Sequence, residues 1–81
     1  MSHPMIELID RRHEEVAAVI NRLRTAHGYT IAKLAEAMEI PYRTLEGKTL
    51  GRYRFTVGEL YFLANLFGLS LSDLLQDPDN L

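Results

Sequence analysis

The fold of this chain is decided by residues 30–45, which read TIAKLAEAMEIPYRTL. Thr30 has the side-chain oxygen that a helix N-cap needs. Pro41 disfavours a helical Ile40 but suits the first turn of a new helix. Between these two points, apolar residues at steps of three and four line one side of a helix: Ile31, Leu34, Ala35 and Met38. The stretch therefore predicts two short helices, one from Thr30 and one over residues 41–49, joined by a tight turn.

A long first helix is predicted upstream of this stretch. Pro4 suits its first turn, and Gly28 lies where a helix can end in a left-handed residue. The side chains between them include one stripe of an amphipathic helix, again at steps of three and four: Ile6, Ile9, His13, Val16, Ile20, Leu23 and His27.

Two pairs of polar residues predict where the remaining helices begin. Thr56 with Glu59 has the spacing of a capping box, in which each side chain accepts the other residue's backbone N–H. Ser70 with Asp73 repeats this start signal. Residues 50–55 before them form a loop. The residues that end or interrupt these helices are Gly51, Gly68 and Pro78. The inward faces are predicted to carry Leu60, Leu63, Ala64, Phe67, Leu71, Leu74 and Leu75.

The composition is that of one small globular domain. The chain has 81 residues, of which 47% are hydrophobic and 25% are charged, and this balance is typical of a folded protein. We expect one all-α domain of five helices over residues 1–81, with frayed tails at residues 1–3 and 77–81. No basic and apolar leader begins the chain, and residues 60–69 are about half as long as a membrane span. We therefore expect a soluble, cytoplasmic protein.

The residue types argue against catalysis and metal binding. The chain has no cysteine, which excludes disulfides and thiolate sites. Its histidines, which are His3, His13 and His27, are not at metal-ligand spacing. No serine or aspartate is placed beside a histidine in a way that suggests a catalytic group. We expect no enzyme activity, no metal or cofactor, and no small-molecule effector.

Charge is distributed unevenly along the chain. The formal net charge is −2, but residues 22–54 contain seven basic residues and three acids, a net of +4. Residues 1–21 have a net charge of −2, and residues 55–81 have a net charge of −4. A basic middle between acidic ends is what an anion-binding surface on a small protein looks like. Chance clustering on solvated faces is the alternative explanation.

The quoted stretch resembles the helix-turn-helix of the phage repressor and Cro family, the lambda-repressor-like DNA-binding domains. The resemblance is carried by a Leu-Ala pair, later apolar positions and a downstream Leu-Leu helix: Leu34, Ala35, Met38, Ile40, Leu45, Gly51 and residues 63–75. It covers about three quarters of the chain, roughly residues 19–75. It implies a five-helix domain in which the third helix reads the major groove of double-stranded DNA.

The chain departs from the family pattern at the turn and in both helices. Glu39 replaces the glycine common in the turn, and glutamate tolerates a positive φ poorly, so we expect a differently bent turn. Ile31 replaces a glutamine that often contacts DNA. Lys48 and Thr49 replace a large apolar residue and a glutamate. Gly47 weakens a helix by about 0.5–1 kcal/mol relative to alanine, so we expect the third helix to end early.

Four residues are predicted to face the bases, namely Tyr42, Arg43, Glu46 and Gly47. Arg43 has the fork that matches guanine O6 and N7, although a phosphate contact or a solvated side chain is an equal alternative. Three roles are predicted for Tyr42: its ring packs on a thymine methyl, its hydroxyl reaches a phosphate, or the side chain covers the small core. Glu46 accepts from cytosine N4 or, as we favour, balances the charge of Arg43. Gly47 permits close approach or marks the helix end.

Phosphate contacts are expected from a second group of side chains, since phosphates supply most of the affinity for DNA. Thr30 lies at a helix N-terminus, whose free N–H groups attract anions. Arg52 and Arg54 alternate with two rings, which would place both charges on one side of an extended segment. The full group is Thr30, Lys33, Thr44, Lys48, Arg52 and Arg54.

These features predict a small sequence-specific transcriptional regulator. One short recognition helix reads few base pairs, so we expect a homodimer on a two-fold site with half-sites about 10 base pairs apart. The first helix or residues 71–81 would form the dimer surface. The alternative is a protein-interaction module, such as an antitoxin or a protein that binds a host factor. The net acidity, Ile31 and the atypical third helix favour that alternative. No membrane partner is expected.

Overall fold

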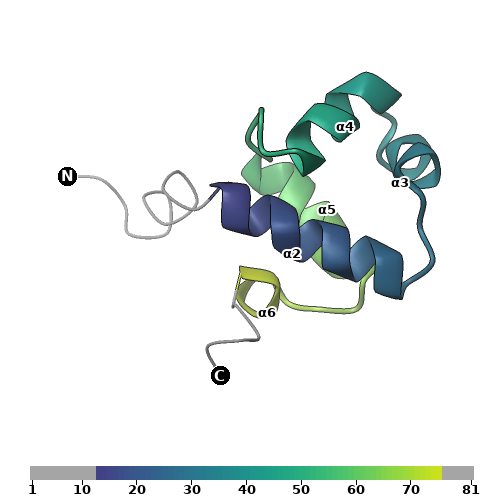
Figure 1. Cartoon of the computed structure of the whole chain (residues 1–81). Coiled ribbons are helices and arrows are strands. Elements are labelled where there is room, and N and C mark those ends of the chain that lie inside the picture. The colour runs from purple at the N-terminus through teal and green to yellow at the C-terminus, as the bar shows by residue number, and fades with distance from the viewer. Residues whose placement is uncertain (1–12, 76–81) are drawn as a thin grey trace.

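The computed structural model describes residues 13–75, and within this range the chain is all helical. The elements are α2 (His13–Ala26), α3 (Ile31–Met38), α4 (Tyr42–Thr49), α5 (Val57–Leu66) and α6 (Leu71–Leu75). Figure 1 shows α3 and α4 as two short helices joined by a tight turn, with α2 crossing the domain beside them. The predicted all-α, five-helix architecture is confirmed, and α3 with α4 forms the predicted helix-turn-helix.

Every described helix contributes a side chain to one core. The largest fully buried side chains are Ile20, Leu34, Leu45, Leu60, Leu63 and Leu74. Burying a side chain of this size stabilises the fold by about 1.5–3 kcal/mol. Ala35 is also buried, where α3 packs against α4. Leu71 lies in the core as predicted, and Leu75 packs against it.

The predicted helix starts are confirmed by hydrogen bonds. The Thr30 side chain accepts from the Lys33 N–H at 3.1 Å. Thr56 and Glu59 form the complete capping box at the start of α5. At the start of α6, the Ser70 hydroxyl accepts from the Asp73 N–H at 3.0 Å. These bonds satisfy N–H groups that the first turn of a helix leaves without a partner.

Four helices end in the same way, with a left-handed residue after the last turn. In each case that residue's N–H and the next N–H bond back to two carbonyls of the last turn, as in a Schellman motif. After α3, the N–H of Ile40 donates to the Ala35 carbonyl at 3.1 Å. The left-handed residues are Gly28, Glu39, Gly51 and Gly68.

The turn between α3 and α4 corrects the expectation that Glu39 bends it differently. Glu39 adopts φ 58° and ψ 41°, the left-handed conformation that glycine adopts at the other three helix ends. The two Schellman hydrogen bonds and the packing of Ile40 against the core hold it there. A left-handed conformation costs a non-glycine residue roughly 1–2 kcal/mol, so the turn stores strain at this position.

Glycine at position 39 is expected to stabilise the domain. Glu39→Gly removes the left-handed strain, and the greater freedom of glycine in the unfolded chain offsets part of the gain. We expect a net increase of up to about 1 kcal/mol in the free energy of unfolding, which raises Tm by a few degrees. Thermal unfolding followed by circular dichroism measures it. Glu36→Gly, inside α3, is the matched control and should lower Tm. A lower Tm for both variants would contradict the strain at Glu39.

Helix α2 is the longest of the five helices within residues 13–75, with 14 residues. Its buried side chains are Val16, Ala17 and Ile20, and Leu23 packs against the core. His27 follows the helix, and its ring lies 4.9 Å from the ring of Phe67 between centroids. Predictions outside the described residues concern Pro4, Ile6, Ile9, Pro78 and the two tails. No helix within residues 13–75 is long and apolar enough to cross a membrane.

Candidate nucleic-acid interface

The first turn of α4 presents the two main base-reading candidates to solvent. Pro41 precedes the helix, and Leu45 directs the opposite side of it into the core. Tyr42 is 48% exposed and Arg43 is exposed. Tyr42 lies outside the core cluster, so it does not cover the core, which was one of its predicted roles. Both side chains are therefore accessible for contact with a ligand.

Glu46 lies one turn further along α4 and is half-buried. Within residues 13–75 no ion pair joins it to Arg43, so the expected charge balance between them is not seen. Its backbone carbonyl accepts from the Thr49 hydroxyl at 2.9 Å and from the Leu50 N–H at 3.0 Å. These bonds close the last turn of α4.

Gly47 does not face outward, which corrects its assignment as a base-reading residue. It is buried, and a Cβ atom added to it would lie 2.5 Å from Cδ2 and Cε2 of Tyr53. The tyrosine ring therefore occupies the place of a side chain at this position. The helix also does not end early, because α4 continues through Gly47 to Thr49. A side chain at position 47 would push the Tyr53 ring away from α4.

Lys48 is not available to phosphate, which corrects a second assignment. Its side chain is only 11% exposed, and its Nζ lies 2.5 Å from Oε1 of Glu59 in an ion pair. The Nζ atom also lies 5.9 Å from the centroid of the Phe55 ring, within reach of a cation–π interaction. Lys48 therefore links α4 to α5, and the Glu59 carboxylate neutralises its positive charge.

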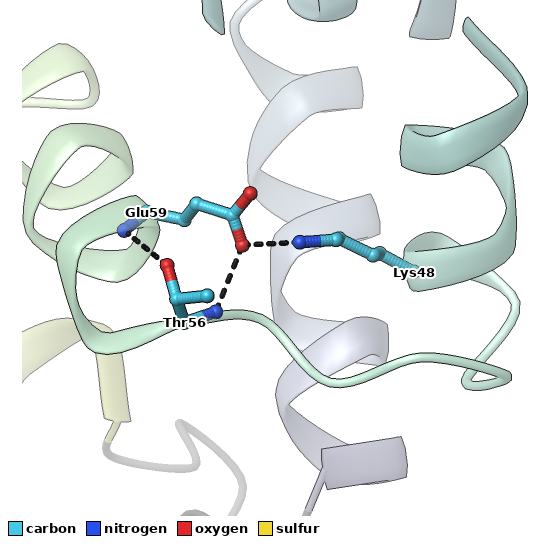
Figure 2. Close-up of polar contacts among 3 residues, drawn as sticks. All are labelled: Lys48, Thr56 and Glu59. Carbon is cyan, nitrogen blue, oxygen red and sulfur yellow. Dashed lines mark hydrogen bonds and ion pairs between the residues drawn. The ribbon is translucent and has the colours of Figure 1, made fainter. Parts of the chain in front are cut away.

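The partner of Lys48 belongs to the capping box of α5, as Figure 2 shows. Oε1 of Glu59 accepts from the Lys48 Nζ and, at 2.8 Å, from the Thr56 N–H. The Glu59 N–H in turn donates to the Thr56 hydroxyl at 3.1 Å. Burial alone would raise the pKa of Glu59, but the hydrogen bonds from Lys48 and Thr56 lower it overall. The cluster ties the last turn of α4 to the first turn of α5.

The lowered pKa of Glu59 predicts that acid weakens the fold. A carboxyl with a lower pKa in the folded state stabilises the fold above its unfolded pKa, near 4.5, and loses that contribution as pH falls through the folded pKa. At pH 7 we expect Glu59→Gln to have a smaller free energy of unfolding than the wild type. This difference should shrink as pH falls below about 4.5. Urea unfolding at a series of pH values measures it. A difference that is constant with pH would contradict the assignment.

A second polar network, which sequence reasoning missed, anchors α4 to α2. The Asn21 side-chain amide donates to the Thr49 carbonyl at 2.8 Å. Arg24 holds Asn21 by donating from Nε to its Oδ1 at 2.9 Å, and it donates from a terminal nitrogen to the Tyr29 carbonyl at 3.1 Å. Asn21 and Thr49 are 28 positions apart. Spacing along the chain carries no signal for such a contact.

The remaining phosphate candidates lie at both ends of the helix-turn-helix. Thr30 and Lys33 are exposed at the start of α3, and Thr44 is half-buried in the first turn of α4. Arg52 and Arg54 are exposed in the loop that follows α4. Along the chain, Arg52 and Arg54 follow the last turn of α4, whereas Arg43 lies in its first turn.

The two rings of this loop do not share one side, contrary to the extended arrangement expected from the sequence. Phe55 is buried in the core, whereas Tyr53 is 59% exposed and covers Gly47. The N–H of Arg52 donates to the Gly47 carbonyl at 2.9 Å. The loop is therefore held against the end of α4 by both its backbone and a ring.

Within residues 13–75, no group of three His, Cys, Asp or Glu side chains is arranged to hold a metal ion. Comparisons with protein-family models, with curated proteins and with solved structures find no match to this chain.

Proposed function

We propose that this protein binds double-stranded DNA and acts in the cytoplasm as a sequence-specific transcriptional regulator. The observation that carries the proposal is the exposed first turn of α4, with Tyr42 and Arg43, on a helix that has exposed basic residues on either side of it. In this reading α4 enters the major groove by its N-terminal end, and Arg43 contacts a guanine. Lys33, Arg52 and Arg54 contact phosphates.

The dimensions and rigidity of α4 support this proposal. An α-helix with its side chains is roughly 10–12 Å across, similar to the width of the major groove, which is about 12 Å. Its last turn is fixed by Asn21 from α2 and by the ion pair of Lys48 with Glu59. A reading helix that is fixed at one end loses little conformational freedom when it binds. Basic groups at both ends then face the two phosphate backbones.

The corrected residue set changes the expected salt dependence. Without Lys48, four basic side chains remain per protomer: Lys33, Arg43, Arg52 and Arg54. Each neutralised phosphate contributes roughly −0.9 to the slope of log K against log salt concentration. Three to four contacts therefore predict a slope of about −3 to −4 per protomer. Selection from a pool of random duplexes tests the proposal, because a regulator enriches one motif and a non-binding domain enriches none.

A protein-interaction module is the competing function, and one observation favours it. Helix α5 exposes three large apolar side chains, and exposed apolar patches mark protein contacts. The antitoxin and host-factor readings belong to this class. Binding of a protein partner through α5 does not require the arginines of α4 and of the loop after it, whereas DNA binding does. Charge reversal of those arginines therefore separates the two functions.

A further inference from the structure

Tyr53 covers one side of α4 from the loop that follows this helix. Its ring atoms Cδ2 and Cε2 lie 2.5 Å from the place that a Cβ atom of Gly47 would take, and Cζ lies 3.7 Å from it. The ring therefore meets the helix by one edge, and the end that bears the hydroxyl lies close to α4. The N–H of Arg52, the preceding residue, donates to the Gly47 carbonyl at 2.9 Å. The backbone of the loop thus places Tyr53 beside Gly47.

The covered side of α4 is the side on which Arg43 is exposed. Successive residues of an α-helix are turned by about 100°, so Gly47 is turned by about 200° from Leu45 but by only about 40° from Arg43. Leu45 is fully buried in the core, whereas Arg43 is exposed. Residues four positions apart on a helix have Cβ atoms roughly 5–6 Å apart. The Tyr53 ring, and not the core, therefore shields Gly47, one helical turn from Arg43.

The Tyr53 side chain is not buried in the domain. It is 59% exposed, whereas Phe55, two residues later, belongs to the core. An aromatic side chain stabilises a fold mainly by burying its ring, and Tyr53 leaves more than half of its surface in water. Its neighbours in the chain, Arg52 and Arg54, are basic and exposed. The surface one turn beyond Arg43 is thus a ring with a hydroxyl, in a loop with two arginines.

The glycine at position 47 makes room for this ring. Glycine inside a helix is less favourable than alanine, and the φ of Gly47 is not positive, so the backbone conformation does not call for glycine. Gly58, the glycine inside α5, has open space around it, with the Thr56 hydroxyl oxygen nearest at 3.9 Å from an added Cβ atom. At position 47, by contrast, the absence of a side chain admits the Tyr53 ring.

We propose that Tyr53 belongs to the surface that binds DNA and that its hydroxyl donates to a phosphate beside the base pair contacted by Arg43. This inference rests on the proposed function and adds a residue to its site. With the N-terminal end of α4 in the major groove, a group one turn further along the helix lies nearer the edge of the groove, where the phosphates are. Tyrosine is among the side chains that donate to phosphate oxygens. Such a contact positions α4 on the duplex and does not itself distinguish one base from another.

The proposed contact differs from those of the arginines because a tyrosine hydroxyl is neutral. A cation that neutralises a phosphate releases counterions, which contributes roughly −0.9 to the slope of log K against log salt concentration. A neutral donor makes no such contribution. Loss of the Tyr53 hydroxyl should therefore weaken binding equally at every salt concentration and for every sequence, whereas Arg52 affects the slope and Arg43 the base preference.

The substitution Tyr53→Phe tests the hydroxyl contact, because it keeps the ring over Gly47 and removes only the donor. Fluorescence anisotropy of the full chain, on a duplex enriched by selection and on a scrambled duplex, measures its effect over a salt series. We expect the affinity for both duplexes to fall by about tenfold, as for a hydrogen bond to a charged group. The salt slope and the ratio of the two affinities should be those of the wild type. Tm should change little.

The substitution Gly47→Ala tests the placement of the ring. Its added Cβ atom would lie 2.5 Å from the ring, so Tyr53 must move, and affinity should again fall by about tenfold. The fold is kept because alanine favours a helix and the ring is at the end of a flexible side chain. Gly58→Ala is the matched control: it adds the same group to α5 in open space and should bind DNA like the wild type. Gly47→Ala with Tyr53→Phe should lose less affinity than the sum of the two single losses, because both disturb one contact.

The possible results separate this inference from the proposed function. If the wild type binds DNA and Tyr53→Phe binds it equally well, the inference is overturned and DNA binding stands. A loss that is confined to the selected duplex, or that changes the salt slope, also overturns the phosphate contact. A folded Gly47→Ala variant with normal affinity overturns the placement by glycine, and if that variant does not fold, Tyr53→Phe still decides. If the wild type binds no duplex at low salt, the proposed function fails and the inference fails with it.

Discussion

Replacing both Arg43 and Arg52 with glutamate is expected to abolish binding to duplex DNA. The double reversal removes the proposed base contact of Arg43, worth about 1–3 kcal/mol, and the proposed phosphate contact of Arg52, and it places two carboxylates beside the DNA backbone. We expect affinity to fall by at least about a hundredfold at low salt. Both side chains are exposed, so Tm should change little. Fluorescence anisotropy with a labelled duplex measures the loss.

The control for this experiment is Arg22→Glu on α2, which changes the net charge as much as either single reversal. It should bind DNA far better than Arg52→Glu, because Arg22 lies on α2 and is not among the residues proposed to contact DNA. Arg43→Ala should relax the preference for one base pair, whereas Arg52→Gln should weaken binding to all sequences alike. If the double reversal bound DNA normally, or lost binding only as much as Arg22→Glu, the basic residues beside α4 would not form the interface.

Replacing Lys48 with methionine is expected to give the largest loss of stability among surface-charge substitutions. Methionine keeps the aliphatic stem but removes the ammonium group, which leaves the Glu59 carboxylate without its cation. Breaking a buried ion pair costs about 3–5 kcal/mol, and this pair is partly exposed, so we expect about 2 kcal/mol. Tm should fall by roughly 10 °C or more. Thermal and urea unfolding measure the change.

Two comparisons show whether Lys48 is structural. Lys33→Met, at an exposed lysine, should leave Tm nearly unchanged. The double variant of Lys48→Met with Glu59→Gln should lose less stability than the sum of the single losses, because both remove the same interaction. Below its unfolding temperature, Lys48→Met should keep the salt slope of DNA binding, whereas Arg52→Gln should reduce it by about 1. If Lys48→Met reduced the salt dependence of DNA binding, Lys48 would contact a phosphate after all.

The sequence predicted the helices well because their signals are local. The N-caps at Thr30 and Thr56 and the left-handed Gly28 depend on neighbours within a few positions. Apolar periodicity likewise depends only on the geometry of one helix. Glu39 is the instructive exception. Residue preference argued against a left-handed turn there, but the hydrogen bonds and the packing of Ile40 outweigh that preference.

The candidate site was predicted less well because its details depend on contacts between distant residues. Lys48 is a basic residue in the last turn of α4, yet its partner Glu59 lies in the next helix. Gly47 reads as a helix weakness until the ring of Tyr53 is placed over it. Contacts with distant residues, and not position along α4, make these two residues inaccessible. A count of basic residues along the chain therefore includes at least one group, the Lys48 ammonium, that is not accessible on the surface.

We propose that the exposed first turn of α4 reads DNA. Fluorescence anisotropy of the full chain on a selected duplex and on a scrambled duplex of equal composition, over a salt series, tests it most directly. The claim predicts tighter binding of the selected duplex at every salt concentration and a slope of log K against log salt of about −3 to −4 per protomer. No binding at the lowest salt, or equal affinity for the two duplexes, would contradict it.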